Sequence, residues 1–354
     1  ILPSLTIFSS TLIASTIIAL SSSHWLLLWM ALELNLLSFV PLMTSSSNHQ
    51  ETEAAIKYFL AQATGSATLL FGVLLTYSNI FYWMNELILP IILSSLLLKM
   101  GAAPFHFWFP NVMSGLSWTS CLLLSTWQKI IPLGILMSLS ASATMFIMVI
   151  SSLSSLVGGI GGMNQTFLRP LLAYSSIGHI GWMLGISMFN LMISLIYFTV
   201  YSLILLPLLF ILNHSQLSNI RQSLSISHIP ATSQMTALLI LLSLGGLPPL
   251  LGFLPKWLTL EHLSFFPQAT PMMMALLLGS LMNLFYYLNV TFSLSLPPMS
   301  STTLNINSTP LFISSLPPIT LITLMTPLLM LALYFFSMIS TFAFQAKSLT
   351  TQKK

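Results

Sequence analysis

The sequence contains no aspartate, and only 4% of its 354 residues are charged. The absence of aspartate excludes a serine–histidine–aspartate triad. The scarcity of charge excludes a soluble domain, because a soluble chain of this length could not cover its surface with so few charged side chains. Hydrophobic residues make up 56% of the chain, which favours an all-α polytopic membrane protein. Because a bilayer-spanning helix needs about 20 apolar residues, the length accommodates roughly ten to twelve spans.

Cysteine is almost absent as well. The single residue, Cys121, excludes an internal disulfide and a multi-cysteine metal or iron–sulfur site. The seven histidines show no HExxH or other ligand spacing, so we expect no metal and no cofactor in this chain. The basic residues form no patch with aromatic or arginine-rich stretches, so no nucleic-acid partner is expected.

Hydrophobic runs separated by polar residues or by glycine and proline predict eleven helices. We expect them at 3–20, 24–44, 53–77, 86–109, 116–138, 142–163, 169–190, 193–213, 233–262, 271–296 and 316–341.

Two of these predicted spans, 86–109 and 233–262, are interrupted by glycine and proline. Proline lacks an N–H and clashes with the preceding helical turn, so the helices should break there. The alternative is that these residues merely kink the spans, as is common in membrane helices. The interrupting residues are Gly101 and Pro104 in the first span and Gly245, Gly246, Pro248 and Pro249 in the second.

The two interrupted spans are the fourth members of two successive groups of five helices. Because five is odd, the second group should run inverted relative to the first, the arrangement of inverted-repeat transporters with a site near mid-membrane. We therefore predict a first repeat at 1–138, a second at 142–296, and a third part at 297–354 that contains a polar connection, the last transmembrane helix and an exposed tail.

Four charged residues lie within long apolar stretches: Glu33, Lys99, Lys129 and Lys256. Each would cost about 2.5–3.5 kcal/mol at the bilayer centre, so such groups usually line a protein-enclosed path for ions or protons. Static ion pairing between helices is the alternative, but one glutamate cannot pair with three lysines.

Two histidines near these residues have two open interpretations. His106 follows the first break and His179 lies in YSSIGHIGW. Each is either a member of a proton relay or an ordinary hydrogen-bonding histidine.

Three segments resemble a known family. They are KMGAAPFHFWFP at 99–110, AYSSIGHIGW at 173–182 and GGLPPLLGFLPKW at 245–257. Together with Glu33 in WMALELNLLSF, they are similar to signatures of the antiporter-like membrane subunits of respiratory NADH dehydrogenase, complex I. The resemblance extends over most of the chain.

The resemblance implies a proton-translocating subunit in the membrane arm of NADH:ubiquinone oxidoreductase, in the mitochondrial inner membrane, with a matrix-side N-terminus. Its partners would be other membrane-arm subunits and inner-membrane phospholipids. The FMN, iron–sulfur clusters and ubiquinone would belong to partner subunits, so the chain would be part of an enzyme without performing redox chemistry.

The resemblance also assigns roles to the buried charges. Glu33 and Lys99 would form a gating pair, Lys129 would carry the proton centrally, and Lys256 would pass it toward the neighbouring half-channel. A nearby carboxylate favours the protonated form of a lysine, so moving the charge of Glu33 away would let the proton leave Lys99.

Two other functions remain open from the residues alone. A stand-alone cation/proton antiporter would exchange sodium or potassium without a redox partner. A structural membrane anchor would use the buried charges only to fix helix packing, and would tolerate a neutral, volume-matched replacement of Lys129.

Overall fold

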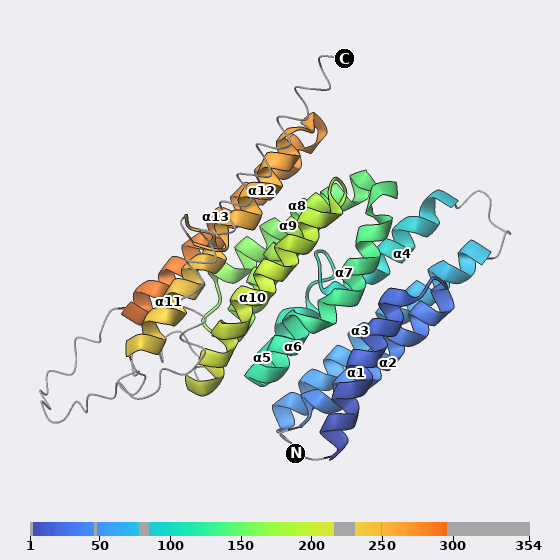
Figure 1. Cartoon of the computed structure of the whole chain (residues 1–354), viewed down its shortest axis with the longest axis horizontal. Coiled ribbons are helices and arrows are strands. Elements are labelled where there is room, and N and C mark those ends of the chain that lie inside the picture. Colours follow the sequence, from blue (N-terminus) through green and yellow to red (C-terminus); the bar gives the residue numbers. More distant parts are fainter. Residues whose placement is uncertain (1–2, 46–47, 78–84, 216–230, 249, 296–354) are drawn as a thin grey trace, which may run out of the picture.

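The computed structural model describes residues 3–45, 48–77, 85–215, 231–248 and 250–295, and the regular elements of this described part are helices (Figure 1). The α-helices are α1 (Pro3–Ser21), α2 (Trp25–Met43), α3 (His49–Tyr77), α4 (Asn85–Met100), α5 (Trp108–Gly115), α6 (Trp118–Ser125), α7 (Trp127–Leu139), α8 (Thr144–Met163), α9 (Leu168–Ser187), α10 (Leu191–Ser215), α11 (Ala231–Gly245), α12 (Phe253–Ser264) and α13 (Thr270–Ser295). Short 3-10 helices, η2 (Ser140–Ser142) and η4 (Pro267–Ala269), precede α8 and α13.

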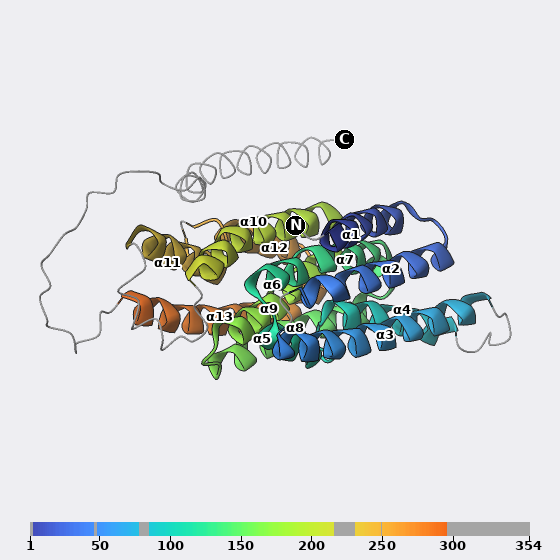
Figure 2. The ribbon, with the colours of Figure 1, turned by 90° about the horizontal axis from the view of Figure 1, so that it is seen from below.

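The helices run roughly parallel to one shared direction, with α1–α3 at one edge of the bundle and α13 toward the other (Figures 1 and 2). Six described segments are long and apolar enough to cross a membrane. The prediction of an all-helical, multi-spanning membrane protein is therefore confirmed. The total of eleven spans stays a prediction, because the helix expected at 316–341 and the third part at 297–354 lie outside the described residues.

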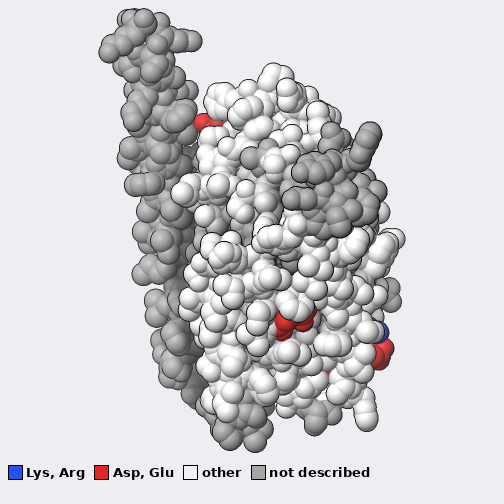
Figure 3. Space-filling view, turned by 90° about the vertical axis from the view of Figure 1, so that its right-hand side faces the viewer, with Lys and Arg blue, Asp and Glu red and all other residues white. Residues whose placement is uncertain are grey.

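The outer surface of the bundle suits a lipid environment. Large apolar side chains are exposed on several helices, among them Ile17 (62%), Leu60 (59%) and Met192 (69%). On the face shown in Figure 3, charged atoms form only small spots among uncharged ones. An apolar surface this extensive would be unfavourable in water and is expected against lipid tails or partner proteins.

α4 and α11 end in the same way, and glycine rather than proline is the reason. Gly101 has φ 74°, and the N–H groups of Gly101 and Ala102 donate to the carbonyls of Leu98 (3.1 Å) and Leu97 (3.0 Å). This pair of bonds is a Schellman motif, which needs the left-handed conformation that glycine adopts without strain. The prediction that Pro104 breaks the fourth span was wrong in its cause, because the helix has already ended at Met100.

The second break repeats this geometry. Gly246 has φ 81°, and the N–H groups of Gly246 and Leu247 donate to the carbonyls of Ser243 (2.9 Å) and Leu242 (3.4 Å). α11 ends at Gly245, and α12 begins at Phe253. Both interrupted spans therefore contain a short helix, a glycine cap, an irregular segment and a second short helix.

A third interruption, at Thr126, was not predicted. The expected continuous helix at 116–138 is divided into α6 and α7, and Thr126 adopts φ −113° and ψ −69°. The Thr126 hydroxyl donates to the Leu122 carbonyl (2.7 Å), a local bond that bends helices. Pro132 lies inside α7 and cannot donate to the carbonyl of Gln128, which loosens the same turn further. Sequence periodicity does not reveal this interruption because the run stays apolar.

α9 is the most enclosed part of the bundle. Of its 20 residues, only Arg169, Pro170 and Tyr174 are not buried. It packs closely on α8 through glycine and serine: a Cβ added to Gly158 would lie 2.5 Å from the backbone N of Gly178. The AYSSIGHIGW segment therefore forms the centre of the molecule, where it can contact helices from both predicted repeats.

We expect Gly158→Ala to destabilise the bundle by about 1–3 kcal/mol, the usual effect of overpacking a filled core. The added methyl would meet backbone atoms of α9, including the Tyr174 carbonyl oxygen at 2.7 Å, so the helices would have to separate. Gly185→Ala is the matched control, because its methyl would meet only flexible side-chain atoms at 3.4 Å. Thermal denaturation in detergent would contradict this prediction if both variants lost the same stability.

Candidate functional site

The structure places the three predicted lysines inside the bundle, each on a different helix. Lys99 lies in the last turn of α4, Lys129 in the first turn of α7 and Lys256 in the first turn of α12. Their exposed fractions are 6%, 2% and 6%. Glu33 lies in the middle of α2 and is half-buried.

Glu33 and Lys99 are close enough to interact electrostatically, although no ion pair joins these two described side chains within 4.0 Å. The stem of Lys99 passes over α3 at Gly65, where an added Cβ would lie 3.0 Å from the lysine Cγ. The structure therefore brings the predicted gating pair together without a direct bond, so a modest movement of α2 or α4 would change their interaction.

Side chains from two helices bind the carbonyl groups that the break leaves at the end of α4. Gln62 donates to the backbone oxygen of Lys99 (3.0 Å), and the indole of Trp108 donates to that of Leu98 (2.9 Å). The Gln62 bond satisfies a carbonyl that the ended helix no longer pairs, whereas the Trp108 bond adds a second donor to the Leu98 carbonyl, which also accepts from the Gly101 N–H. Both bonds fix the backbone beneath Lys99.

Lys129 is the most isolated of the charged groups. Its ammonium is buried and has no hydrogen-bond partner among the described protein atoms. Its Nζ lies 5.0 Å from the ring centroid of Phe109 and 5.5 Å from that of Tyr201. Aromatic faces stabilise a cation, but they do not bind its proton, so Lys129 can pass a proton to a neighbouring acceptor.

The second break holds Lys256 directly. Its Nζ donates to the carbonyl oxygen of Gly245 (2.8 Å), the last residue of α11. The carbonyls at a helix C-terminus carry partial negative charge, which favours a cation there. The adjacent Gly246 leaves room for the side chain, because a Cβ at that position would lie 2.7 Å from the lysine Nζ.

His179 lies between the second and third lysines in electrostatic terms, since it interacts with both Lys129 and Lys256. Its Nδ1 lies 2.9 Å from the hydroxyl of Tyr197, and its Nε2 is buried without a hydrogen-bond partner among the described protein atoms. Its ring is 5.0 Å from that of Tyr201, which also contacts Lys129. The histidine therefore makes a helix–helix bond through one nitrogen and keeps the other available.

His106 has a more local environment. It is 7% exposed, its Nδ1 lies 3.2 Å from the Pro104 carbonyl oxygen, and its ring stacks near Phe107 (4.2 Å between centroids). These contacts belong to the irregular segment between α4 and α5. They are the contacts expected of a structural histidine, and a relay role for His106 stays a prediction.

A neutral polar chain links α2, α3 and α7 close in sequence to Glu33 and Lys129, and sequence reasoning missed it. Tyr58 donates to Gln128 Oε1 (3.3 Å), and Gln128 donates to Asn35 Oδ1 (3.0 Å). Asn35 lies two residues beyond Glu33, and Gln128 precedes Lys129. The sequence offered one signal for this chain: Asn35 and Gln128 lie within apolar runs, and a buried amide there needs a hydrogen-bond partner.

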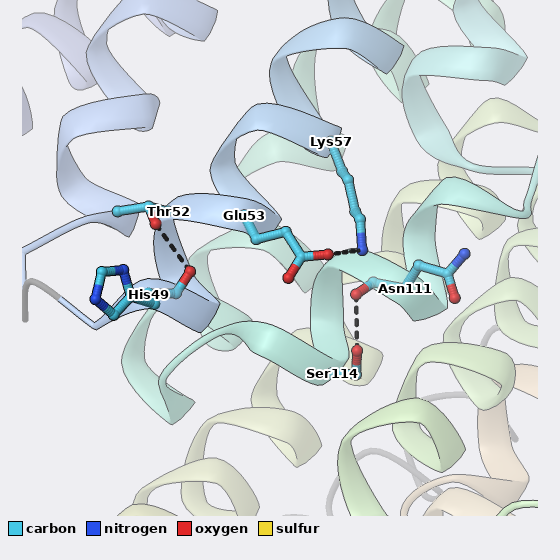
Figure 4. A network of polar contacts seen from close by, with 6 residues as sticks. All are labelled: His49, Thr52, Glu53, Lys57, Asn111 and Ser114. Carbon is cyan, nitrogen blue, oxygen red and sulfur yellow. Dashed lines mark hydrogen bonds and ion pairs between the residues drawn. The ribbon is translucent and has the colours of Figure 1, made fainter.

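The charges on the outside of the bundle form a separate network. Figure 4 shows Glu53 and Lys57 on α3, joined at 2.6 Å, with the side chains of Asn111 and Ser114 on the neighbouring α5. The two charged side chains are 67% and 49% exposed. Exposed pairs of this kind contribute little to stability, so Lys57 serves as a reference for an ordinary surface lysine.

Residues 22–283 match the family model described as NADH:quinone oxidoreductase/Mrp antiporter, TM. The chain belongs to this NADH:quinone oxidoreductase/Mrp antiporter family. The matched region contains the six residues predicted from sequence to line the site, and the resemblance noted on the sequence is confirmed.

Relatives within the family agree with this assignment. NADH-ubiquinone oxidoreductase chain 2 of Lumbricus terrestris is 44% identical over 302 residues, which cover 84% of this chain and 88% of the relative. The Anopheles gambiae protein of the same name is 44% identical over 292 residues, covering 81% and 85%.

Solved structures show the same architecture. A chain of respiratory complex I from Thermus thermophilus with bound aureothin has a TM-score of 0.76 and 27% identity, over 93% of this chain and 77% of that chain. A chain of the Mrp complex from Dietzia sp. DQ12-45-1b has a TM-score of 0.74 over 93% and 75%; at 16% identity it shows the fold alone.

Proposed function

We propose that the chain is a proton-translocating, antiporter-like membrane-arm subunit of NADH:ubiquinone oxidoreductase, located in the mitochondrial inner membrane with its N-terminus on the matrix side. The observation that carries the proposal is the buried ammonium of Lys129, which has no hydrogen-bond partner among the described protein atoms and which interacts electrostatically with His179, as Lys256 also does. A buried cation without a fixed counter-ion is energetically unfavourable, so a protein that keeps one usually uses it for function.

In this proposal Glu33 controls the proton affinity of Lys99 by its distance. As the carboxylate approaches, the ammonium of Lys99 is stabilised; as it retreats, Lys99 releases one proton and becomes a neutral amine. Lys129 accepts a proton and passes it toward Lys256 by way of Tyr201, whose ring is near both Lys129 and His179, and His179, which interacts electrostatically with both lysines. The oxidation of NADH and the reduction of ubiquinone occur in partner subunits, which hold the FMN and iron–sulfur clusters.

We also propose that 1–138 and 142–296 are inverted repeats and that 297–354 forms a third part. The matching glycine caps at Gly101 and Gly246 support this organisation. The repeats are not identical: Lys99 precedes its break, whereas Lys256 follows it. Other membrane-arm subunits and inner-membrane phospholipids would cover the exposed apolar surface.

A stand-alone cation/proton antiporter is the second candidate. The family model includes Mrp antiporters as well as oxidoreductase subunits and does not separate the two functions, and the similarity to the Mrp complex, at 16% identity, concerns the fold. The more similar relatives, at 44% identity, bear the name of an oxidoreductase chain and favour the first function.

Native gel electrophoresis of gently solubilised membranes tests the proposal. We expect mass spectrometry to find the chain in a large band that stains for NADH oxidation. Recovery of the chain only as a small species without that activity, together with sodium or potassium exchange by the purified chain in liposomes, would overturn the proposal in favour of the antiporter.

A further inference from the structure

α13 carries a set of buried polar side chains that the lysine relay does not use. Asn283, Tyr286 and Tyr287 are 2%, 2% and 0% exposed. The Oδ1 of Asn283 has no hydrogen-bond partner among the described protein atoms. The two hydroxyls interact with each other and with Ser175, but neither makes a hydrogen bond of ordinary geometry with a described protein atom. Buried polar atoms in proteins are paired in roughly 90% of cases or more, and ordered water, with about three bonds per molecule, is the usual partner when protein is not.

The inner end of this set lies at the second break. A Cβ on Gly245 would be 3.8 Å from the ring of Tyr287, and the Gly245 carbonyl is the acceptor for Lys256. Tyr287 also interacts electrostatically with Tyr201, whose buried hydroxyl interacts with Ser176 but makes no hydrogen bond of ordinary geometry with a described protein atom. Tyr201 in turn contacts both His179 (5.0 Å) and Lys129 (5.5 Å).

The outer end lies near one face of the bundle. The rings of Tyr287 and Tyr286 are 4.7 Å apart between centroids, and the Tyr286 ring packs on α8, where a Cβ at Gly162 would be 2.5 Å away. Gly162 is the penultimate residue of α8, and Asn164 and Thr166 in the following turn are exposed. Polar atoms therefore continue from the lysines to the α8–α9 turn.

We propose that Tyr201, Tyr287 and Tyr286, together with Asn283, form a hydrated branch that conducts protons between Lys129 and the membrane face at the α8–α9 turn. The proposal deepens the function proposed above and rests on it. Each hydroxyl or water oxygen accepts one proton and donates another, so Lys129 changes from ammonium to amine while one proton emerges at the far end. The hydroxyls themselves end unchanged.

Tyr287→Phe in the assembled complex tests the branch, because it removes one oxygen and keeps the ring. We expect normal assembly and a proton-to-electron ratio that falls toward that of a Lys129→Met variant. Phe285→Leu, on the exposed side of the same helical turn (55% exposed), should keep the normal ratio. A loss in Lys129→Met without a loss in Tyr287→Phe would overturn the branch alone, whereas normal ratios in both would overturn the relay itself.

X-ray hydroxyl-radical footprinting of the unmodified complex provides a test that needs no variant. Radicals form from bound water, so Tyr286 and Tyr287 should be oxidised faster than Tyr58, which is equally buried (2%) but donates its hydroxyl to Gln128. Oxidation as slow as that of Tyr58 would show a dry cluster and overturn the proposal, even if Tyr287→Phe failed to assemble.

Discussion

Replacing Lys129 with methionine is expected to stop proton translocation through this chain while leaving the complex assembled. The ammonium contacts the ring of Tyr201 and interacts with His179, so its loss removes the charged group proposed to link the Glu33–Lys99 pair with Lys256. Methionine has a similar length and fills the space against Phe109. The proton-to-electron ratio of reconstituted vesicles would measure the effect.

Assembly should survive this substitution for a physical reason. A buried ammonium without a hydrogen-bond partner opposes folding, and replacing buried ionic groups by well-packed apolar ones is often neutral or stabilising by about 1–4 kcal/mol. The matched control is Lys57→Met, whose lysine is exposed and forms an ion pair with Glu53 on its own helix. A normal ratio in the assembled Lys129→Met complex would contradict the relay and favour a structural role for the buried charges.

Gly246→Ala is expected to cause the second large effect, a loss of both stability and activity. An alanine at φ 81° is strained by about 1–2 kcal/mol. Its methyl would also lie 2.7 Å from the Nζ of Lys256 and displace it from the Gly245 carbonyl. Losing a hydrogen bond to a charged group adds about 1.5–3 kcal/mol.

Variants of two other glycines, the adjacent Gly245 and the cap residue Gly101 of the first break, separate these contributions. Gly245→Ala should be tolerated, because its methyl would meet only Tyr287 and Leu284 atoms at ordinary distances of 3.8–4.0 Å. Gly101→Ala has the same backbone strain, with φ 74°, but its methyl would meet Phe109 and no lysine. Denaturation temperature and proton-to-electron ratio should be measured for all three. A Gly246→Ala variant that behaved like Gly245→Ala would contradict the role of the cap.

The sequence by itself determined the class of the protein and the residues at its centre. Apolar runs of the length of a bilayer predicted nearly all the described helices, since hydrophobic thickness fixes span length. The high cost of charge in lipid singled out Glu33, Lys99, Lys129 and Lys256 before their positions were known. Glycine and proline located both breaks, although the sequence assigned the first to Pro104 rather than to the left-handed cap at Gly101.

Only the tertiary structure decided how these residues act together. The proximity of Glu33 to Lys99, the position of His179 relative to two lysines and the Gly245 carbonyl bound by Lys256 depend on which helices pack side by side. The interruption at Thr126 and the buried tyrosines of α13 were likewise invisible, because threonine and tyrosine are ordinary residues in apolar spans. Periodicity and composition predict which residues a single helix buries. They do not predict the partner of a buried polar atom, because that partner depends on which separate helices pack together.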